Sequence, residues 1–177
     1  MTRKEKYRAT HSKNRSYRTR RALRLIRKSQ PKTVDEARKL GLGALIEVGQ
    51  GAFRTAYRIH GTRLLIKFPL MFKYDTQPGS WNDKEGKNHT RMEVKKIRSL
   101  LEFPMWRKHL PPVYYFNDRD GVMVTKYYRP RKKSVVNAER NMLIGELVKE
   151  FCGVVLGDIT DDNVRVDRNL VIIDCGY

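Results

Sequence analysis

The chain has 177 residues, of which 40% are hydrophobic and 32% are charged, and its formal net charge is +19. This length suits one domain with an ordinary core and leaves little room for two. So large a positive charge exceeds what solubility requires of a small domain. We therefore expect part of the surface to bind a polyanionic partner. No apolar run approaches the ~20 residues of a membrane helix, and residues 1–15 contain no apolar segment of the signal-peptide type.

The cysteine content favours a reducing compartment. Cys152 and Cys175 are the two cysteines of the sequence, and neither belongs to a CxxC motif or to a Cys/His cluster with metal-ligand spacing. We therefore expect a soluble intracellular protein of the cytoplasm without a membrane partner. The Arg-rich, acid-poor start leaves a transit peptide to an organelle as the alternative.

The positive charge is concentrated at the N-terminus. Residues 1–32 contain 13 Lys or Arg and one acid, Glu5, so that 12 of the 19 net charges lie there. Residues 1–20 show no apolar periodicity, which is typical of disorder, whereas residues 22–28 could extend a helix that Pro31 would end. The sequence thus predicts a basic extension over 1–32, disordered or partly helical, and one domain over 33–177.

The domain itself alternates between strand-like and helical patterns, which predicts the α+β class. The TVDE sequence at 33–36 has the form of a capping box, and Gly41 follows it as the end of a short helix. We expect antiparallel strands at 45–49, 53–60 and 62–69, and a β-hairpin around the turn at 118–121. Further helices are expected at 89–103, with Met92, Ile97, Leu100 and Leu101 on its apolar side, and at 137–151. The last expected elements are short buried strands at 154–156, 164–166 and 170–173.

Three residues in the strand-rich half could form a phosphate site. Gly49 and Gly51 lie two apart between two expected strands, although a lone GxG is more often a simple turn. Lys67 lies inside the apolar strand LLIKF, where a charge requires a partner, and Glu93 on the following helix could be that partner. The simpler interpretation of Lys67 is a strand lysine that points outward into solvent.

Three polar residues flank the short strands near the C-terminus. Asp158, Asn163 and Asp174 would lie at strand ends on one side of a cleft. Carboxylate and amide oxygens are hard ligands suited to Mg²⁺, which accompanies nucleotide phosphates. Each of them alone is more often a turn former.

In this order, the glycines, the strand lysine, the helix glutamate and the three C-terminal residues resemble the protein-kinase-like superfamily over residues 44–177. The resemblance implies an antiparallel β N-lobe over about 44–128 with one αC-type helix. It implies a much reduced C-lobe over about 134–177 that ends after the DFG-type strand. ATP and Mg²⁺ are the cofactors that it implies.

The resemblance also assigns roles in the upper half of the site. Gly49 and Gly51 match the first two glycines of the loop that covers the ATP phosphates. Lys67 matches the lysine that holds the α- and β-phosphates, and Glu93 matches its helix partner. TKYY resembles the hinge, with Thr125 in the gatekeeper position and the backbone groups of Lys126 and Tyr128 directed to the adenine edge.

In the C-terminal half, Asp158 matches the catalytic base, Asn163 the metal-binding asparagine, and Asp174 the metal-binding aspartate of the DFG-type segment Asp174–Cys175–Gly176. The departures concern neighbouring positions. Arg54 replaces the third loop glycine, which we expect to alter loop flexibility more than nucleotide binding. Gly157 replaces the arginine before the base, Thr160 stands where a phosphate-binding lysine is common, and Cys175 replaces the switch phenylalanine.

Three functions remain open on the sequence. The first is an ATP- and Mg²⁺-dependent phosphotransferase acting on Ser, Thr or another hydroxyl, including its own. The second is a nucleotide-binding pseudokinase scaffold, because the resemblance does not include the helical platform on which kinases bind their substrate. The third is a nucleic-acid-binding accessory protein, because RSYRTRRALRLIRK and KYYRPRKK combine cations with tyrosines. An acidic protein surface is as eligible as nucleic acid to be the partner of the basic tail. The alternative is that the tail has no partner and only keeps the protein soluble.

The resemblance leaves the reduced C-lobe without its usual supporting helices. An apolar surface of this kind requires a cover, and three segments are candidates. They are residues 22–43, the helix expected at 137–151, and a partner protein chain.

Overall fold

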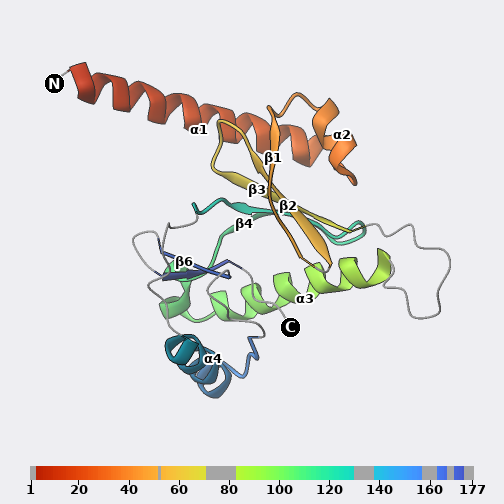
Figure 1. Cartoon of the computed structure of the whole chain (residues 1–177), viewed down its shortest axis with the longest axis vertical. Coiled ribbons are helices and arrows are strands. Elements are labelled where there is room, and N and C mark those ends of the chain that lie inside the picture. The colour runs from red at the N-terminus through yellow and green to blue at the C-terminus, as the bar shows by residue number, and fades with distance from the viewer. Residues whose placement is uncertain are drawn as a thin grey trace.

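The computed structural model describes residues 3–51, 53–70, 83–129, 138–156, 163–166 and 170–173. Within them the chain is an α+β protein built on one five-stranded antiparallel sheet and one two-stranded sheet (Figure 1). The elements in chain order are α1 (Arg3–Ser29), α2 (Val34–Lys39), β1 (Leu45–Gln50), β2 (Arg54–Ile59), β3 (Leu64–Pro69), α3 (Asp83–Leu101), the 3₁₀ helix η1 (Pro104–Lys108), β4 (Val113–Asn117), β5 (Val122–Lys126), α4 (Ala138–Cys152), β6 (Val164–Val166) and β7 (Leu170–Ile172).

The five-stranded sheet has the order β1-β2-β3-β5-β4, so that β3 is its central strand. Helices cover both faces: α1 and α2 lie on one side, and α3 crosses the other (Figure 1). Every residue of β3 is buried as a result. Side chains alternate between the two faces of a strand, and β3 therefore sends neighbouring residues into different environments.

The first core lies between the sheet and α1. Leu64, Ile66 and Phe68 of β3 pack there against Ala22 and Ile26 of α1. The intervening Lys67 consequently faces the opposite side, toward α3. The alternation of side chains along β3 thus gives the sheet one apolar face, which packs on α1, and one face that carries the charge of Lys67.

Helix α1 begins much earlier than the sequence predicted. The expected helix covered residues 22–28, and residues 1–20 were expected to be disordered, whereas α1 extends from Arg3 to Ser29. No Gly or Pro interrupts this segment, and Arg, Lys, Ala and Leu have high helix propensity. Ala22 and Ile26 anchor its C-terminal part in the core, so the basic extension is in part a structural layer of the protein.

The second core lies beneath α3 and joins it to the C-terminal elements. It contains buried apolar residues of α3, α4, β7 and the intervening segments, namely Ile97, Leu100, Leu110, Val148, Leu156 and Ile172. Helix α4 is therefore the candidate cover that packs on this part of the protein, whereas residues 22–43 pack on the far face of the sheet. None of the helices in the described ranges is long and apolar enough to cross a membrane.

Three local predictions were wrong. The helix expected at 89–103 is α3, which begins six residues earlier, at Asp83, and ends at Leu101. Met92 was expected on the apolar side of its helix but is 43% exposed, because Val94, Ile97 and Leu100 form the buried stripe at the three-residue spacing that Met92 does not share. Residues 154–156 were expected to form a strand but have no regular secondary structure. Leu156 is nevertheless buried there, so the apolar pattern reflected burial in the second core.

Candidate functional site

The most unusual feature of the interior is a buried ion pair between β3 and α3. Lys67 Nζ lies 2.9 Å from Glu93 Oε1, and the exposed fractions of the two side chains are 7% and 2%. The partnership that the sequence predicted is therefore present, and the outward-facing alternative for Lys67 is wrong. Two charges withdrawn from water in this way stabilise a fold only weakly, because desolvation offsets most of their attraction.

Glu93 also pairs with a second cation, Arg54 at the start of β2, through its other carboxylate oxygen. Arg54 is 12% exposed, so all three charged side chains are largely buried. The register of the sheet brings them together: Ala56 pairs directly with Lys67, and Arg54 lies two residues from Ala56 on the same face. We name Arg54, Lys67 and Glu93 the charged triad.

The triad lies next to the C-terminal strands. Lys67 Nζ is 3.3 Å from the carbonyl oxygen of Ile173, which directly precedes Asp174 in the sequence. The backbone N–H of Ile173 in turn donates to the carbonyl of Asn163, at 2.7 Å. Two segments that the sequence predicted to carry metal ligands are thus brought to the same place as the strand lysine.

The turn between β1 and β2 contains the two predicted loop glycines. Its closing hydrogen bond joins the Gly51 N–H to the Arg54 carbonyl, at 2.9 Å. Among the atoms of the described residues, none lies within 4 Å of a Cβ atom built on Gly49, and only the Arg54 carbonyl, at 3.9 Å, lies within that distance of one built on Gly51. Neither glycine has a positive φ. The described residues therefore leave room for a side chain at either position.

The far side of this turn is pinned to α3. The ring of Phe53 stacks on His89 with 3.5 Å between the ring centroids, and Arg54 reaches Glu93 one helical turn further. Gly86 permits the approach, because a Cβ atom there would lie 2.9 Å from the Phe53 carbonyl. The expected effect of Arg54 was on loop flexibility. Its ion pair with Glu93 adds a direct tie between the turn and the helix.

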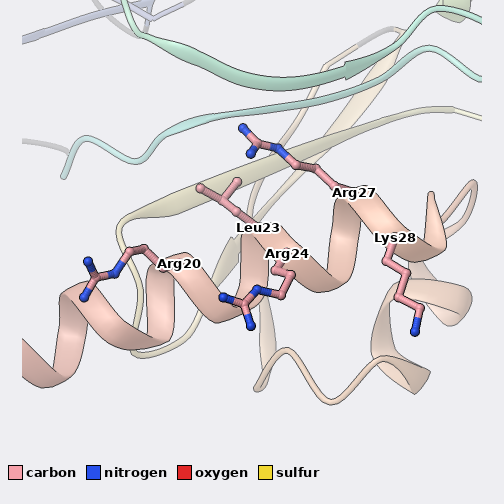
Figure 2. Close-up of a pocket in the computed structure, with 5 residues that line it drawn as sticks. All are labelled: Arg20, Leu23, Arg24, Arg27 and Lys28. Atoms are coloured by element: carbon pink, nitrogen blue, oxygen red, sulfur yellow. The ribbon is translucent and has the colours of Figure 1, made fainter.

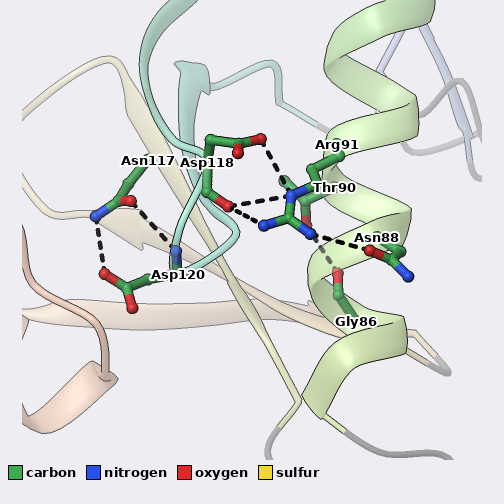
Figure 3. A network of polar contacts seen from close by, with 7 residues as sticks. All are labelled: Gly86, Asn88, Thr90, Arg91, Asn117, Asp118 and Asp120. Carbon is green, nitrogen blue, oxygen red and sulfur yellow. Dashed lines mark hydrogen bonds and ion pairs between the residues drawn. The ribbon is translucent and has the colours of Figure 1, made fainter.

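A polar network holds the other side of α3 to the β4–β5 turn (Figure 3). Arg91 donates to the backbone carbonyl of Asp118 through Nη2 at 2.8 Å and to its carboxylate through Nε at 3.1 Å. Gly121 brings the turn against the helix, since a Cβ atom there would lie 2.8 Å from the Cα atom of Lys87. Helix α3 is thereby fixed in the position in which Glu93 meets Lys67.

The hinge-like segment follows β5 along the edge of the site. Thr125 is buried on β5, directly opposite Leu65 of β3. The Tyr127 N–H donates to the Arg63 carbonyl at 2.8 Å. The contact of the Lys126 and Tyr128 backbone groups with an adenine edge stays a prediction.

Two predicted site residues, Asp158 and Asp174, lie outside the described residues, so their positions relative to Lys67 stay predictions. Among the described residues, no group of three His, Cys, Asp or Glu side chains could hold a metal ion. Asn163 is described and half-buried at the start of β6. A metal site built from Asn163 and Asp174 stays a prediction.

Sequence reasoning missed the ionic role of Arg54 and the contact of Phe53 with His89. Strand alternation could have found Arg54, because it lies on the same face as Lys67 once β2 and β3 are paired. No periodic signal predicts the stacking of Phe53 on His89, which depends on how α3 docks.

No protein-family model and no curated protein matches the sequence.

Proposed function

We propose that the protein is an ATP- and Mg²⁺-dependent phosphotransferase of the protein-kinase-like type that acts on a hydroxyl acceptor, its own residues included. The observation that carries the proposal is the buried pair of Lys67 and Glu93, joining the central strand of an antiparallel sheet to the helix that crosses it. The contact of Lys67 with the carbonyl of Ile173 supports it further, because this contact puts the lysine beside the segment that leads to Asp174.

The burial of the pair argues for a function beyond stability. A strand lysine on this face could be replaced by an apolar residue at little cost, since buried ion pairs are often matched by well-packed hydrophobic side chains. Retaining an amino group next to a strand terminus and a glycine turn is the arrangement expected of a phosphate-binding lysine. The room that the described residues leave around Gly49 and Gly51 fits the same ligand.

The polar groups of the proposed site are of the kinds that bind a nucleotide and its metal ion. Lys67 would contact the phosphates, the amides of the glycine turn would cover them, and the peptide groups of Lys126 and Tyr128 would face the base. Asn163 and Asp174 would hold Mg²⁺ through hard oxygen ligands. Bound ATP and Mg²⁺ supply the transferable phosphoryl group and the countercharge for it. Glu93 positions Lys67, and Asp158 is the proposed acceptor of the proton from the attacking hydroxyl.

Two aspartate substitutions test the proposal and separate an enzyme from a scaffold. We expect Asp158→Asn to keep the rise in melting temperature that Mg-ATP causes while reducing phosphoryl transfer by ~10²-fold or more, the scale of general-base contributions. Asp174→Asn should lose both properties. The measurements are thermal unfolding with and without Mg-ATP, and transfer of labelled phosphate from ATP to the protein or to extract proteins.

The alternative is a nucleotide-binding pseudokinase. It would be supported by a wild-type thermal shift, weakened in Lys67→Ala, without any detectable turnover. If saturating Mg-ATP left the melting temperature of the wild-type protein unchanged, both the enzyme and the nucleotide-binding scaffold would be excluded.

A further inference from the structure

Helix α1 presents a row of cations on the side of the helix opposite to its core residues, and one edge of this row, at Arg27, reaches the sheet. Eight cations among its described side chains are exposed, and five of them lie on this side: Lys13, Arg20, Arg24, Arg27 and Lys28. At 3.6 residues per turn they fall within an arc of about 100° around the helix. Ala22 and Ile26 lie on the opposite side, in the core. We name these five cations the basic face of α1.

The basic face surrounds an open hollow of about 550 Å³ lined by Arg20, Leu23, Arg24, Arg27 and Lys28 (Figure 2). Arg27 donates to the backbone carbonyl of Tyr114 at 3.0 Å, which joins the face to β4. Within the described part of the chain, none of the five cations pairs with a carboxylate. The hollow is thus lined by cationic groups around one apolar side chain.

The positive surface continues from α1 onto the sheet. Burial raises the pKa of the Tyr114 hydroxyl, and the nearby cations Lys126 and Arg63 lower it in part. Arg63 is also joined to α1, because its N–H donates to the Thr19 hydroxyl at 3.4 Å. Cations from the helix, from β5 and from the turn before β3 therefore converge around Tyr114.

Apart from the hydrogen bond of Arg27, this arrangement of cations costs the helix stability. Like charges four residues apart on a helix, as in Arg20 with Arg24 and Arg24 with Lys28, each destabilise it by about 0.2–0.5 kcal/mol. Ala22 and Ile26 already dock the helix. A face needed only for solubility would tolerate mixed signs, whereas α1 contains twelve Lys or Arg and one acid, Glu5.

We propose that the basic face of α1 binds the phosphodiester backbone of nucleic acid without reading its sequence. Three of the four cations that line the hollow are arginines, whose planar fork matches phosphate oxygens. Tyr17 lies on the same side of the helix and is 62% exposed, so it can stack on an unpaired base. The helix is 27 residues long, or about 40 Å, which suits an extended polymer.

A membrane surface fits the helix poorly. A helix that lies in a lipid interface needs an exposed apolar side opposite its cations. In α1, Ala22 and Ile26, which occupy that side, are 2% and 0% exposed within the first core. The inference does not depend on the proposed phosphotransferase, because Arg20, Arg24 and Lys28 are outside the candidate site.

The test compares two full-length variants with the same loss of formal charge. Arg20→Gln/Arg24→Gln/Lys28→Gln removes three cations of the basic face. Lys95→Gln/Arg107→Gln/Lys108→Gln removes three exposed cations from α3 and η1, on the other side of the sheet. Fluorescence anisotropy with a labelled single strand and a labelled duplex, each at several salt concentrations, gives the affinity and its salt dependence. Circular dichroism checks that both variants keep the helix content of the wild type.

We expect the basic-face variant to reduce the slope of log affinity against log salt by about 2–3, the loss of three phosphate contacts. The control variant should keep the wild-type slope. Equal losses in the two variants, or no loss in the first, would show that net charge alone binds and would overturn the proposal. Displacement of the nucleic acid by poly-glutamate at equal charge concentration would also overturn it, in favour of an acidic protein partner.

Discussion

Removing the charge of Glu93 while keeping its shape should be among the most destabilising single changes in the protein. In Glu93→Gln, Lys67 and Arg54 lose the carboxylate that they share, and their side chains are only 7% and 12% exposed. Truncating one partner of a buried ion pair typically costs about 3–5 kcal/mol of the free energy of unfolding. For a chain of this size that loss corresponds to a fall in melting temperature of about 6–20 °C.

The matched control is Asp118→Asn. It removes a surface carboxylate that also pairs with a residue of α3, Arg91. The side chains of Arg91 and Asp118 are 40% and 71% exposed, so solvent screens their attraction. The expected loss is at most about 1 kcal/mol. Thermal and urea unfolding, followed by circular dichroism, measure both variants. A Glu93→Gln protein no less stable than Asp118→Asn would refute the idea that the triad is a buried electrostatic unit.

A third variant tests the role of the charged triad even if Glu93→Gln does not fold. Replacing the whole charged triad by apolar residues, Arg54→Met/Lys67→Met/Glu93→Leu, removes every charge at once. Such replacements are often neutral or stabilising, so we expect a folded protein within about 2 kcal/mol of the wild type. It should no longer show a thermal shift with Mg-ATP. Unfolding of this variant would mean that the triad has an architectural role that apolar packing does not replace.

Two further predictions follow from the glycine turn and from a buried tyrosine. Gly49→Ala should leave stability unchanged or raise it by up to about 1 kcal/mol, because no atom of the described residues lies within 4 Å of its Cβ atom. It should weaken the Mg-ATP thermal shift, because the added methyl group lies on the turn that would cover the phosphates. Gly121→Ala is the contrasting control, destabilised by its positive φ and by contact with Lys87, with the nucleotide shift retained. Burial raises the pKa of Tyr114 above 10.0, so its contribution to stability is present below pH 10 and is lost as the pH rises through the folded-state value. Urea unfolding from pH 9 to 11 should therefore show a smaller loss in Tyr114→Phe than in the wild type, and identical pH profiles would contradict this assignment.

The sequence alone predicted the strands β1 to β7, with one additional strand at 154–156 that does not form, and it predicted the β-hairpin and helix α4. Strand and helix periodicities depend on residues only two to four positions apart. It also predicted the partnership of Lys67 and Glu93 from their order along the chain and a resemblance. The capping of α2 was equally local: the Glu36 N–H donates to the Thr33 hydroxyl at 3.2 Å. In each case the information lies within one element or in the succession of elements.

Tertiary structure decided the partners that depend on register and docking. Arg54 and Glu93 are 39 residues apart, and they meet because the pairing of β2 with β3 turns Arg54 toward α3. Helix α1 became a layer of the fold because Ala22 and Ile26 found the face of β3 opposite Lys67, which no pattern within α1 reveals. Periodicity shows that a residue is apolar or charged at a certain angle around its own element. Which neighbour occupies that direction is determined by the packing of elements far apart in the chain.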